Sequence, residues 1–257
     1  GGHTGTLDPM ATGLLPLTFG EATKFSQTLL DADKAYEATV RLGVTTTTAD
    51  AEGEVLDTCP VAVTDAQLDA ALAQLRGEIE QVPPMYSALK HHGKALYEYA
   101  REGVEIPRAP RRVTIHRLDL LAWDGEALRI RVECSKGTYI RTLASDLGAL
   151  LGCGAHLTAL RRTRIGPFEL AVAIPLADFE ALDAEARDVA LAPVDEVDGF
   201  QLDHRPQRLV AADEARQWIV PPSDGTDSIQ FEITVGRGDE VGDALAHRGP
   251  QIGRAHV

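Results

Sequence analysis

Alternating hydrophobic and polar residues predict the strands of this chain. Over residues 34–43 apolar side chains recur at every second position, as they do in a strand that buries one face. These apolar positions are Tyr36, Ala38, Val40 and Leu42. Residues 111–137 predict two long strands joined by a hairpin at Asp124-Gly125, a dipeptide that favours tight turns. Residues 155–168 also have an extended pattern, whereas we interpret the polar residues 45–53 as a loop.

Helical patterns separate these strands. Thr64 and Gln67 make a capping box ahead of leucines spaced three and four residues apart, which predicts a helix that stops at Gly77. The other predicted helices span 21–30, 94–103 and 138–152. The segment 82–90 cannot begin as a regular helix, because its two consecutive prolines lack N–H donors.

The order of these elements predicts the class of fold. Strands and helices do not alternate as regular βαβ units, which favours an α+β fold with a mixed, largely antiparallel sheet over a doubly wound fold. Beyond residue 170 the pattern weakens into a short helix, a loop near Pro193 and a small acidic unit of strands and turns. We therefore divide the chain into a domain over 1–170, a connecting helical segment over 171–199 and a small C-terminal domain over 200–257.

Composition narrows the class of protein. The chain has 257 residues, of which 44% are hydrophobic and 25% charged, as in globular proteins. Its apolar runs are shorter than the roughly 18 residues that span a bilayer, so we expect no membrane segment. The three cysteines are far apart in sequence, which argues against a disulfide framework or a zinc site and favours the reducing cytoplasm.

The net charge of −14 argues against a polyanionic partner, but its distribution changes that picture. Residues 171–257 carry 7 Lys or Arg against 17 Asp or Glu, whereas residues 129–164 are locally basic. Because salt screens charges beyond about 8–10 Å, a local basic surface can still bind phosphates. The alternative interpretation of these cations is a solvated face of mixed charges.

The Gly-rich opening GGHTGTLDPMATG presents one carboxylate, Asp8, directly before Pro9. Because the residue before a proline is disfavoured in the α region, we expect Asp8 on an extended stretch. The flanking glycines allow a ligand to approach the backbone. Such a carboxylate suits nucleophilic or general-base chemistry on a sugar or a base. From the spacing alone, an Asp8 that forms a turn or caps a helix at Pro9 is an equal alternative.

A second group of candidate residues lies in CSKGTYIRTLASDLG, residues 134–148. Lys136 and Arg141 flank Tyr139 where a predicted strand passes into a predicted helix. An aromatic ring among cations is a platform for a stacked base with phosphates nearby. Tyr36 is a similar candidate on the strand over 34–43. For both tyrosines the alternative is an aromatic residue of the core.

Four ordered blocks of the chain resemble a known family. The blocks are GHTGTLDPMATGLLPLTFGEATKFSQTLLDADKAYEATVRLG, MYSALKHHGKALYEYAREGVEIPR, CSKGTYIRTLASDLG and LGCGAHLTALRRTRIGPF. In this order they resemble the bacterial tRNA pseudouridine-55 synthases, the TruB family, strongly over about residues 1–170 and weakly over 171–257. The resemblance implies the α+β core of pseudouridine synthases, followed from about residue 200 by a small PUA-like β unit.

The resemblance implies roles for individual residues. Asp8 corresponds to the catalytic aspartate, and Arg141 to the basic residue that pairs with it. Tyr36 and Tyr139 correspond to tyrosines that bind the substrate, with Tyr139 stacked on the base and acting in removal of the C5 proton.

Further contacts with the substrate follow from the same resemblance. His3 would help to displace the target nucleotide from the T-loop stack, and Leu160 would line the pocket. Lys24 and Lys136 would contact phosphates.

The resemblance also implies the reaction, the isomerisation of uridine 55 in the T-arm of tRNA to pseudouridine. The target base leaves its stack, the C1′–N1 bond breaks, and the base rejoins the sugar through C5. Asp8 either attacks C1′ or removes a proton from C2′, and both routes are open. We expect no cofactor, because nothing is oxidised, and a monomer that binds tRNA.

The same residues are also consistent with two alternative functions. One is a chaperone that binds the T-arm and helps tRNA to fold without catalysis. Such a protein has no need of a carboxylate at the sugar. The other is a guide-RNA-dependent pseudouridine synthase, which the bacterial form of the blocks disfavours. The family's K-P-x-G-x-[ST]-[ST] block, expected about 20–40 residues before Asp8, does not occur here, so we interpret the sequence as an N-terminally truncated fragment with an incomplete C-terminal domain.

Overall fold

The computed structural model describes residues 2–18, 23–24, 26–183, 185–186, 192–193, 208–212, 218–220 and 229–231. The chain forms two compact units, residues 1–213 and 214–257. In the second unit, β16 (Trp218–Val220) pairs antiparallel with β17 (Ile229–Phe231). Most of the predicted PUA-like unit lies outside the described residues, and the predicted domain boundaries at 170 and 200 stay predictions.

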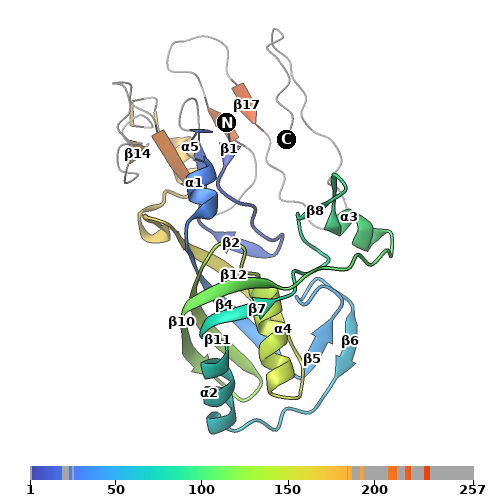
Figure 1. Cartoon of the computed structure of the whole chain (residues 1–257). Helices are drawn as coiled ribbons and strands as arrows, with labels where there is room; N and C mark the ends of the chain where they lie inside the picture. The colour runs from blue at the N-terminus through green and yellow to red at the C-terminus, as the bar shows by residue number, and fades with distance from the viewer. Residues whose placement is uncertain are drawn as a thin grey trace. The chain divides into compact units, whose positions relative to one another are not determined.

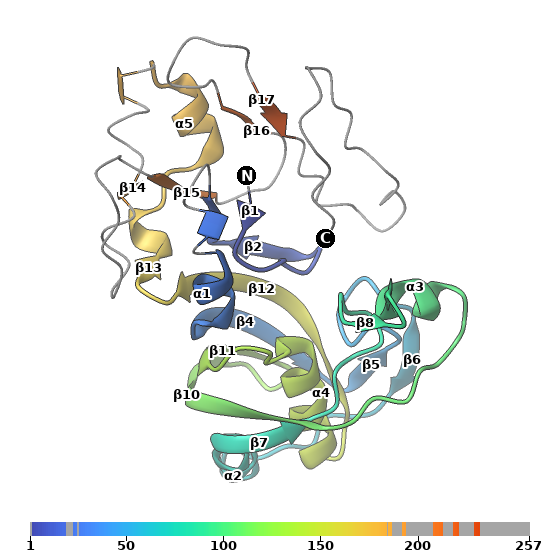
Figure 2. The same cartoon turned by 45° about the horizontal axis from the view of Figure 1, so that its top comes forward.

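The larger sheet of the first unit has seven strands in the order β13-β12-β4-β11-β10-β7, with β2 paired to β12 (Figure 1). Their bounds are β2 (Ala11–Gly13), β4 (Lys34–Leu42), β7 (Gly77–Gln81), β10 (Arg111–Trp123), β11 (Ala127–Cys134), β12 (Ala155–Ile165) and β13 (Phe168–Glu169). All neighbours are antiparallel except β2, which runs parallel to β12 and lies beside it in Figure 2. The predicted α+β fold with a mixed, largely antiparallel sheet is confirmed.

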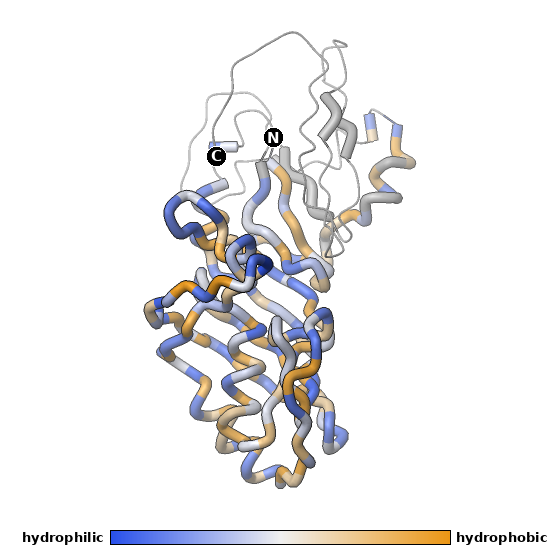
Figure 3. Tube along the Cα trace, turned by 90° about the vertical axis from the view of Figure 1, so that its right-hand side faces the viewer, coloured by the Kyte–Doolittle hydropathy of each residue, from blue (hydrophilic) through white to orange (hydrophobic). Residues whose placement is uncertain are grey.

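The strands predicted from period-2 patterns form as expected. The four apolar positions predicted in β4 are all buried. Figure 3 shows hydrophobic and hydrophilic residues mixed along the described chain. β10 and β11 join at Asp124-Gly125, where Gly125 has φ of +99°. The Asp124 carboxylate accepts hydrogen bonds from the N–H groups of Glu126 and Ala127 at 2.9 and 2.7 Å, which closes the turn.

Two helices, α2 (Asp65–Gln74) and α4 (Ile140–Leu150), contribute to the same core as the sheet. The capping box of α2 is present: Thr64 Oγ1 accepts from the N–H of Gln67, and the Gln67 side chain accepts from the N–H of Thr64. α4 buries Leu143, Ala144 and Leu147 against the core. The core therefore joins residues of β4, β11 and β12 to both helices, and it gives the start of α4 a rigid base.

A second sheet has the order β1-β3-β15-β14. Its strands are β1 (Gly2–His3), β3 (Leu15–Thr18), β14 (Ala192–Pro193) and β15 (Arg208–Ala212). β15 pairs with β3, so these residues from late in the chain belong to the first unit. Pro193, predicted in a loop, instead ends the short strand β14, whose partner β15 could not be inferred from local pattern.

The remaining helices follow the predictions with shifted bounds. They are α1 (Ser26–Asp31), α3 (Leu96–Arg101), the short 3-10 helix Leu170–Val172 and α5 (Leu176–Ala181). The start of the helix predicted over 21–30 lies partly outside the described residues. Among the described residues, no helix is long and apolar enough to cross a membrane.

Two short hairpins were not predicted, one in the predicted loop over 45–53 and one that takes the first two residues of the helix predicted over 94–103. β5 (Val44–Thr46) pairs with β6 (Val55–Thr58), so the loop prediction over 45–53 was wrong at its first residues. β8 (Lys90–His91) pairs with β9 (Lys94–Ala95) directly before α3. Both hairpins are short and expose much of their surface, so neither has the apolar alternation that predicts a strand.

Candidate active site

Asp8 lies in a tight turn just before β2. The N–H of Ala11 donates to the carbonyl oxygen of Asp8 at 2.8 Å, and Pro9 occupies the second position of the turn, which its fixed φ favours. The chain then enters β2 instead of a helix, so the alternative of a helix capped at Pro9 is wrong. The turn uses the backbone of Asp8 and leaves the carboxylate for other contacts.

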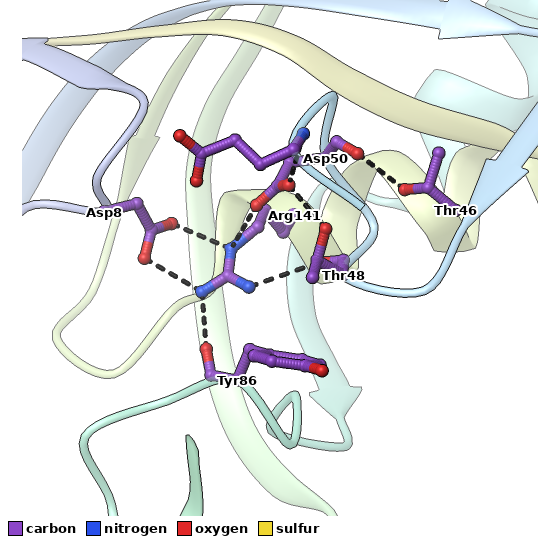
Figure 4. Close-up of polar contacts among 7 residues, drawn as sticks. Asp8, Thr46, Thr48, Asp50, Tyr86 and Arg141 are labelled. Atoms are coloured by element: carbon purple, nitrogen blue, oxygen red, sulfur yellow. Dashed lines mark hydrogen bonds and ion pairs between the residues drawn. The ribbon is translucent and has the colours of Figure 1, made fainter. Parts of the chain in front are cut away.

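The carboxylate of Asp8 forms a two-point ion pair with Arg141, the second residue of α4 (Figure 4). Nε of Arg141 donates to Oδ2 at 2.9 Å, and Nη2 donates to Oδ1 at 2.8 Å. The Arg141 side chain is 4% exposed and the Asp8 side chain 29% exposed. A bidentate pair fixes the orientation of a carboxylate, so a buried cation holds Asp8 while part of its surface stays accessible.

Arg141 also contacts three residues in two other parts of the chain, the turn between β5 and β6 and the segment after β7. Nη1 donates to the carbonyl oxygen of Thr48 at 3.2 Å, and Nη2 donates to that of Tyr86 at 2.7 Å. Nε lies 3.6 Å from Oδ2 of Asp50, whose side chain is 5% exposed. The guanidinium is always protonated in proteins, so it balances two carboxylates at once.

Asp50 is a member of this cluster that sequence analysis missed. It belongs to the turn between β5 and β6, where its Oδ1 accepts from Thr48 Oγ1 at 2.5 Å and from the N–H of Glu52 at 3.0 Å (Figure 4). An aspartate after a run of threonines is typical of a turn. No local signal marks it as a partner of Arg141, because that contact exists only in the folded chain.

Tyr139 is half-buried at the N-cap position of α4, and burial raises the pKa of its phenol. The charges of Asp8 and Arg141 both act on this pKa, so the three predicted catalytic residues lie in one electrostatic neighbourhood. The backbone of Tyr139 forms two hydrogen bonds with the side chain of Gln81. The N–H of Tyr139 donates to Gln81 Oε1 at 3.1 Å, and Gln81 Nε2 donates to the carbonyl oxygen of Tyr139 at 3.3 Å. Gln81 was also missed from the sequence.

Tyr36 is buried in β4 with 8% of its surface exposed. Burial raises the pKa of Tyr36 to about 12, and the positive charge of Arg162 opposes part of that rise. The ring therefore stays a neutral phenol at physiological pH. The charge of Asp8 also acts on this pKa, in the direction that raises it.

Arg162, in β12, ties the segment that carries Asp8 to the sheet. Its side chain is among the most buried of the described residues, and it donates from Nε to the carbonyl of Leu14 at 2.8 Å and from Nη2 to that of Gly5 at 3.1 Å. Gly13 has φ of +99°, and a Cβ there would lie 2.2 Å from the carbonyl oxygen of Arg162. Glycine is therefore required at position 13 for this close approach.

His3 and Leu160 occupy contrasting environments. His3 is exposed in β1, and its Nδ1 accepts from the N–H of Gly5 at 3.4 Å. Partial desolvation of its ring, and to a smaller extent the positive charge of Arg162, lowers the pKa of His3. Leu160 is 6% exposed and belongs to the main core. Their predicted contacts with a flipped nucleotide stay predictions.

The two predicted phosphate-binding lysines are exposed. Lys136 Nζ lies 3.1 Å from Oδ1 of Asp31, the last residue of α1. Lys24 lies in the short described segment before α1. The structure thus brings Asp8, Arg141 and Tyr139 together, and it places both lysines at the surface.

The basic residues of 129–164 are largely paired with acids, as the alternative of a solvated charged face expects. Two glutamates on the sheet, Glu37 and Glu133, each face two arginines. The pairs are Arg129–Glu37 at 3.7 Å, Arg131–Glu37 at 2.8 Å, Arg117–Glu133 at 3.7 Å and Arg164–Glu133 at 2.9 Å. We call these six side chains the sheet-face ion pairs.

Metal ligands do not gather in the part of the chain that the structure describes. No group of three or more His, Cys, Asp or Glu side chains there could hold a metal ion. All three cysteines are unpaired, with Cys59 exposed and Cys134 and Cys153 buried. At Asp8 the described side chains place an oriented carboxylate beside an arginine and a tyrosine.

Comparison with known families covers most of the first unit. Residues 1–140 match the N-terminal domain of the TruB family pseudouridylate synthases, and residues 141–197 match the C-terminal domain of tRNA pseudouridylate synthase B. The boundary between the matches falls at the start of α4, between Ile140 and Arg141.

Individual relatives and a solved structure agree with these matches. The chain is 71% identical over 209 residues to tRNA pseudouridine synthase B of Aromatoleum aromaticum, covering 78% of this chain and 68% of that protein. It is 58% identical over 232 residues to the protein of the same name from Azoarcus sp., covering 90% and 77%. A crystal structure of a Cbf5-Nop10-Gar1 complex is similar with a TM-score of 0.55 and 27% identity, covering 85% of this chain and 64% of that chain.

Proposed function

This chain belongs to the TruB family of pseudouridylate synthases, and on that premise we propose that it converts uridine 55 in the T-arm of tRNA to pseudouridine. The bacterial relatives named tRNA pseudouridine synthase B support tRNA as the substrate. The observation that carries the proposal is the bidentate ion pair of Asp8 with the buried Arg141.

Asp8 is the residue that acts on the ribose. Arg141 fixes the carboxylate through two hydrogen bonds, and the accessible part of Asp8 is where a sugar can approach. Asp8 either attacks C1′ and displaces N1 of uracil, or removes the C2′ proton so that N1 leaves to form a glycal. In the first route C5 then displaces the Asp8 carboxylate from C1′, and in the second C5 adds to C1′ of the glycal while Asp8 returns the proton to C2′. In both routes the C1′–N1 bond breaks, a C1′–C5 bond forms, N1 gains a proton and C5 loses one.

The two tyrosines hold the base. Tyr139, with its raised pKa, is a neutral phenol that stacks on the uracil and takes part in removal of the C5 proton. Tyr36, also a neutral phenol, contacts the base from β4. Extruding a base from its stack costs a few kcal/mol, which stacking and hydrogen bonds in the site offset.

The test is release of tritium from T-arm RNA labelled at C5 of uridine 55. The wild-type chain should release tritium, and Asp8→Ala should release none above background while still binding the RNA. Asp57→Ala, at an exposed aspartate of β6, is the matched control and should keep wild-type release. Binding without release by the wild-type chain would instead support a T-arm chaperone.

A deuterated substrate separates the two routes for Asp8. Deuterium at C2′ slows breakage of a C–H bond there, so a slower reaction would identify the glycal route. An unchanged rate in single turnovers that are limited by chemistry would identify attack at C1′.

A further inference from the structure

The start of α4 lacks the residue type that normally caps a helix. Tyr139 occupies the N-cap position, and its side chain makes no capping hydrogen bond. Ser, Thr, Asp and Asn are preferred there because their oxygens accept from N–H groups of the first turn. A tyrosine at this position therefore leaves the first turn of α4 in need of support from elsewhere in the fold.

Gln81, at the end of β7, holds the backbone of the N-cap residue itself and leaves the N–H groups of the first turn to other partners. Its carboxamide accepts from the N–H of Tyr139 at 3.1 Å and donates to the carbonyl of Tyr139 at 3.3 Å. The same carbonyl accepts the first bond of the helix, from the N–H of Leu143 at 3.0 Å. Gln81 is 2% exposed, so water does not compete for these bonds.

The chain that follows Gln81 also holds the side chain of Arg141, in the first turn of α4. After Gln81 the two prolines at 83 and 84 end the strand, and the backbone carbonyl of Tyr86 accepts from Arg141 Nη2 at 2.7 Å. One short segment therefore contacts Tyr139 through a side chain and Arg141 through a carbonyl. The backbone of this helix start and the guanidinium are fixed by the same piece of chain.

We propose that Gln81 is a positioning residue, whose carboxamide sets the Tyr139 peptide and so places the Tyr139 ring and the Arg141 guanidinium against Asp8. It touches no substrate. This inference rests on the proposed function, because it assigns Gln81 an effect on turnover that acts through Tyr139 and Arg141. Misplacing reacting groups by about 1 Å costs roughly a hundredfold in rate.

Two substitutions separate the effects of the two hydrogen bonds that the Gln81 carboxamide makes with Tyr139. Gln81→Met keeps the length of the side chain and removes both hydrogen bonds. Gln81→Glu keeps an oxygen that accepts from the Tyr139 N–H and lacks, when ionised, the donor to the Tyr139 carbonyl. We expect kcat to fall about 100-fold in Gln81→Met and about tenfold in Gln81→Glu, with the Kd for T-arm RNA changed less than about twofold.

Arg76 offers a matched structural control. Its guanidinium also ties a side chain to a distant backbone carbonyl, donating from Nε and Nη2 to Leu118 in β10 at 3.0 and 2.7 Å. Arg76→Met should lower the melting temperature and leave kcat at the wild-type value. If it lowers kcat as much as Gln81→Met does, or if Gln81→Met keeps wild-type kcat, the inference is overturned.

A readout without substrate separates this inference from the proposed function. Hydrogen exchange of backbone amides in residues 139–145 should be faster in Gln81→Met than in the wild-type chain, and unchanged in Arg76→Met. Unchanged exchange in Gln81→Met would contradict the positioning role even if the enzyme is active. A wild-type chain that releases no tritium would refute the proposed function, while the exchange result would still report on Gln81.

Discussion

Asp50 is the side chain through which the turn between β5 and β6 acts on the site. Its carboxylate lies 3.6 Å from Arg141 Nε, on the same nitrogen that donates to Asp8. Removing its charge would leave the guanidinium balanced by a single carboxylate and free to shift toward Asp8. The position of Arg141 therefore depends on both acids.

We predict that Asp50→Asn lowers kcat roughly tenfold to a hundredfold, because Asp8 and Arg141 lose their fixed relative position. Single-turnover tritium release from T-arm RNA measures the effect. Asp57→Asn, at an exposed aspartate of β6, is the control. Equal rates in the two variants would mean that Asp50 does not position Arg141.

The three cysteines should differ sharply in reactivity. Cys59 is exposed, whereas Cys134 and Cys153 are 1% and 7% exposed. Burial raises the pKa of Cys134 to about 12, so at pH 8 roughly one molecule in ten thousand carries the reactive thiolate there. Iodoacetamide should therefore modify one cysteine in the folded chain and three in urea, as mass spectrometry would show. Fast modification of Cys134 in the folded chain would contradict its burial.

At the scale of elements, α2 is stabilised by its own sequence. Thr64 and Gln67 exchange hydrogen bonds in the capping box, and the buried leucines of the helix pack in the core. This element needs little from distant parts of the chain, and it forms where the local pattern predicts it.

We predict that Thr64→Ala lowers the free energy of unfolding by about 1 kcal/mol, because the N–H of Gln67 in the first turn of α2 loses its acceptor, the Thr64 hydroxyl. Urea unfolding followed by circular dichroism measures the change. Thr58→Ala, on the exposed strand β6, should change stability by less than about 0.5 kcal/mol. A similar loss in both variants would show that the capping box contributes nothing specific.

Elements and site residues with a local signature could be predicted from the sequence. The alternation in β4, the Asp124-Gly125 turn and the capping box of α2 each lie within a few residues, and the structure contains all three. β7 gave no such signal, because it is an edge strand with mostly exposed residues and acquires its structure by pairing with β10. Such an element depends on tertiary partners.

The same reasoning separates the residues of the candidate site. The motif around Asp8 and the segment around Tyr139, with its aromatic ring between cations, could be identified as candidate sites from their residue types. Asp50, Gln81 and Arg162 have ordinary local surroundings, and their importance comes from contacts with residues far away in sequence. Those contacts form only when the chain folds, so the spacing of residues along the sequence does not predict them.

For the whole molecule, the arrangement of charges matters more than the net charge of −14. In the sheet-face ion pairs four arginines share two glutamates, Glu37 and Glu133, and Arg117 also pairs with Asp119. Because these pairs are partly exposed, they contribute little to stability. We expect the two glutamates to weaken the attraction of this face of the sheet for phosphate backbones.

We predict that the double variant Glu37→Gln, Glu133→Gln binds non-cognate RNA at 50 mM salt and loses this binding by 200 mM, since the unpaired arginines attract phosphates. A filter-binding titration measures it. The control Glu105→Gln, Glu126→Gln changes the net charge equally at ion pairs elsewhere and should not gain such binding. Equal gains would assign the effect to net charge alone.

The contacts of Arg141 also constrain how the chain folds. Its hydrogen bonds reach partners 55, 93 and 133 residues away in sequence. Closing such long loops costs conformational entropy, and contacts between distant residues form slowly. After dilution from urea, the helices should therefore regain their circular dichroism before the enzyme regains activity. Partly folded chains would have no functional site, so activity would count only chains that have completed folding of the first unit.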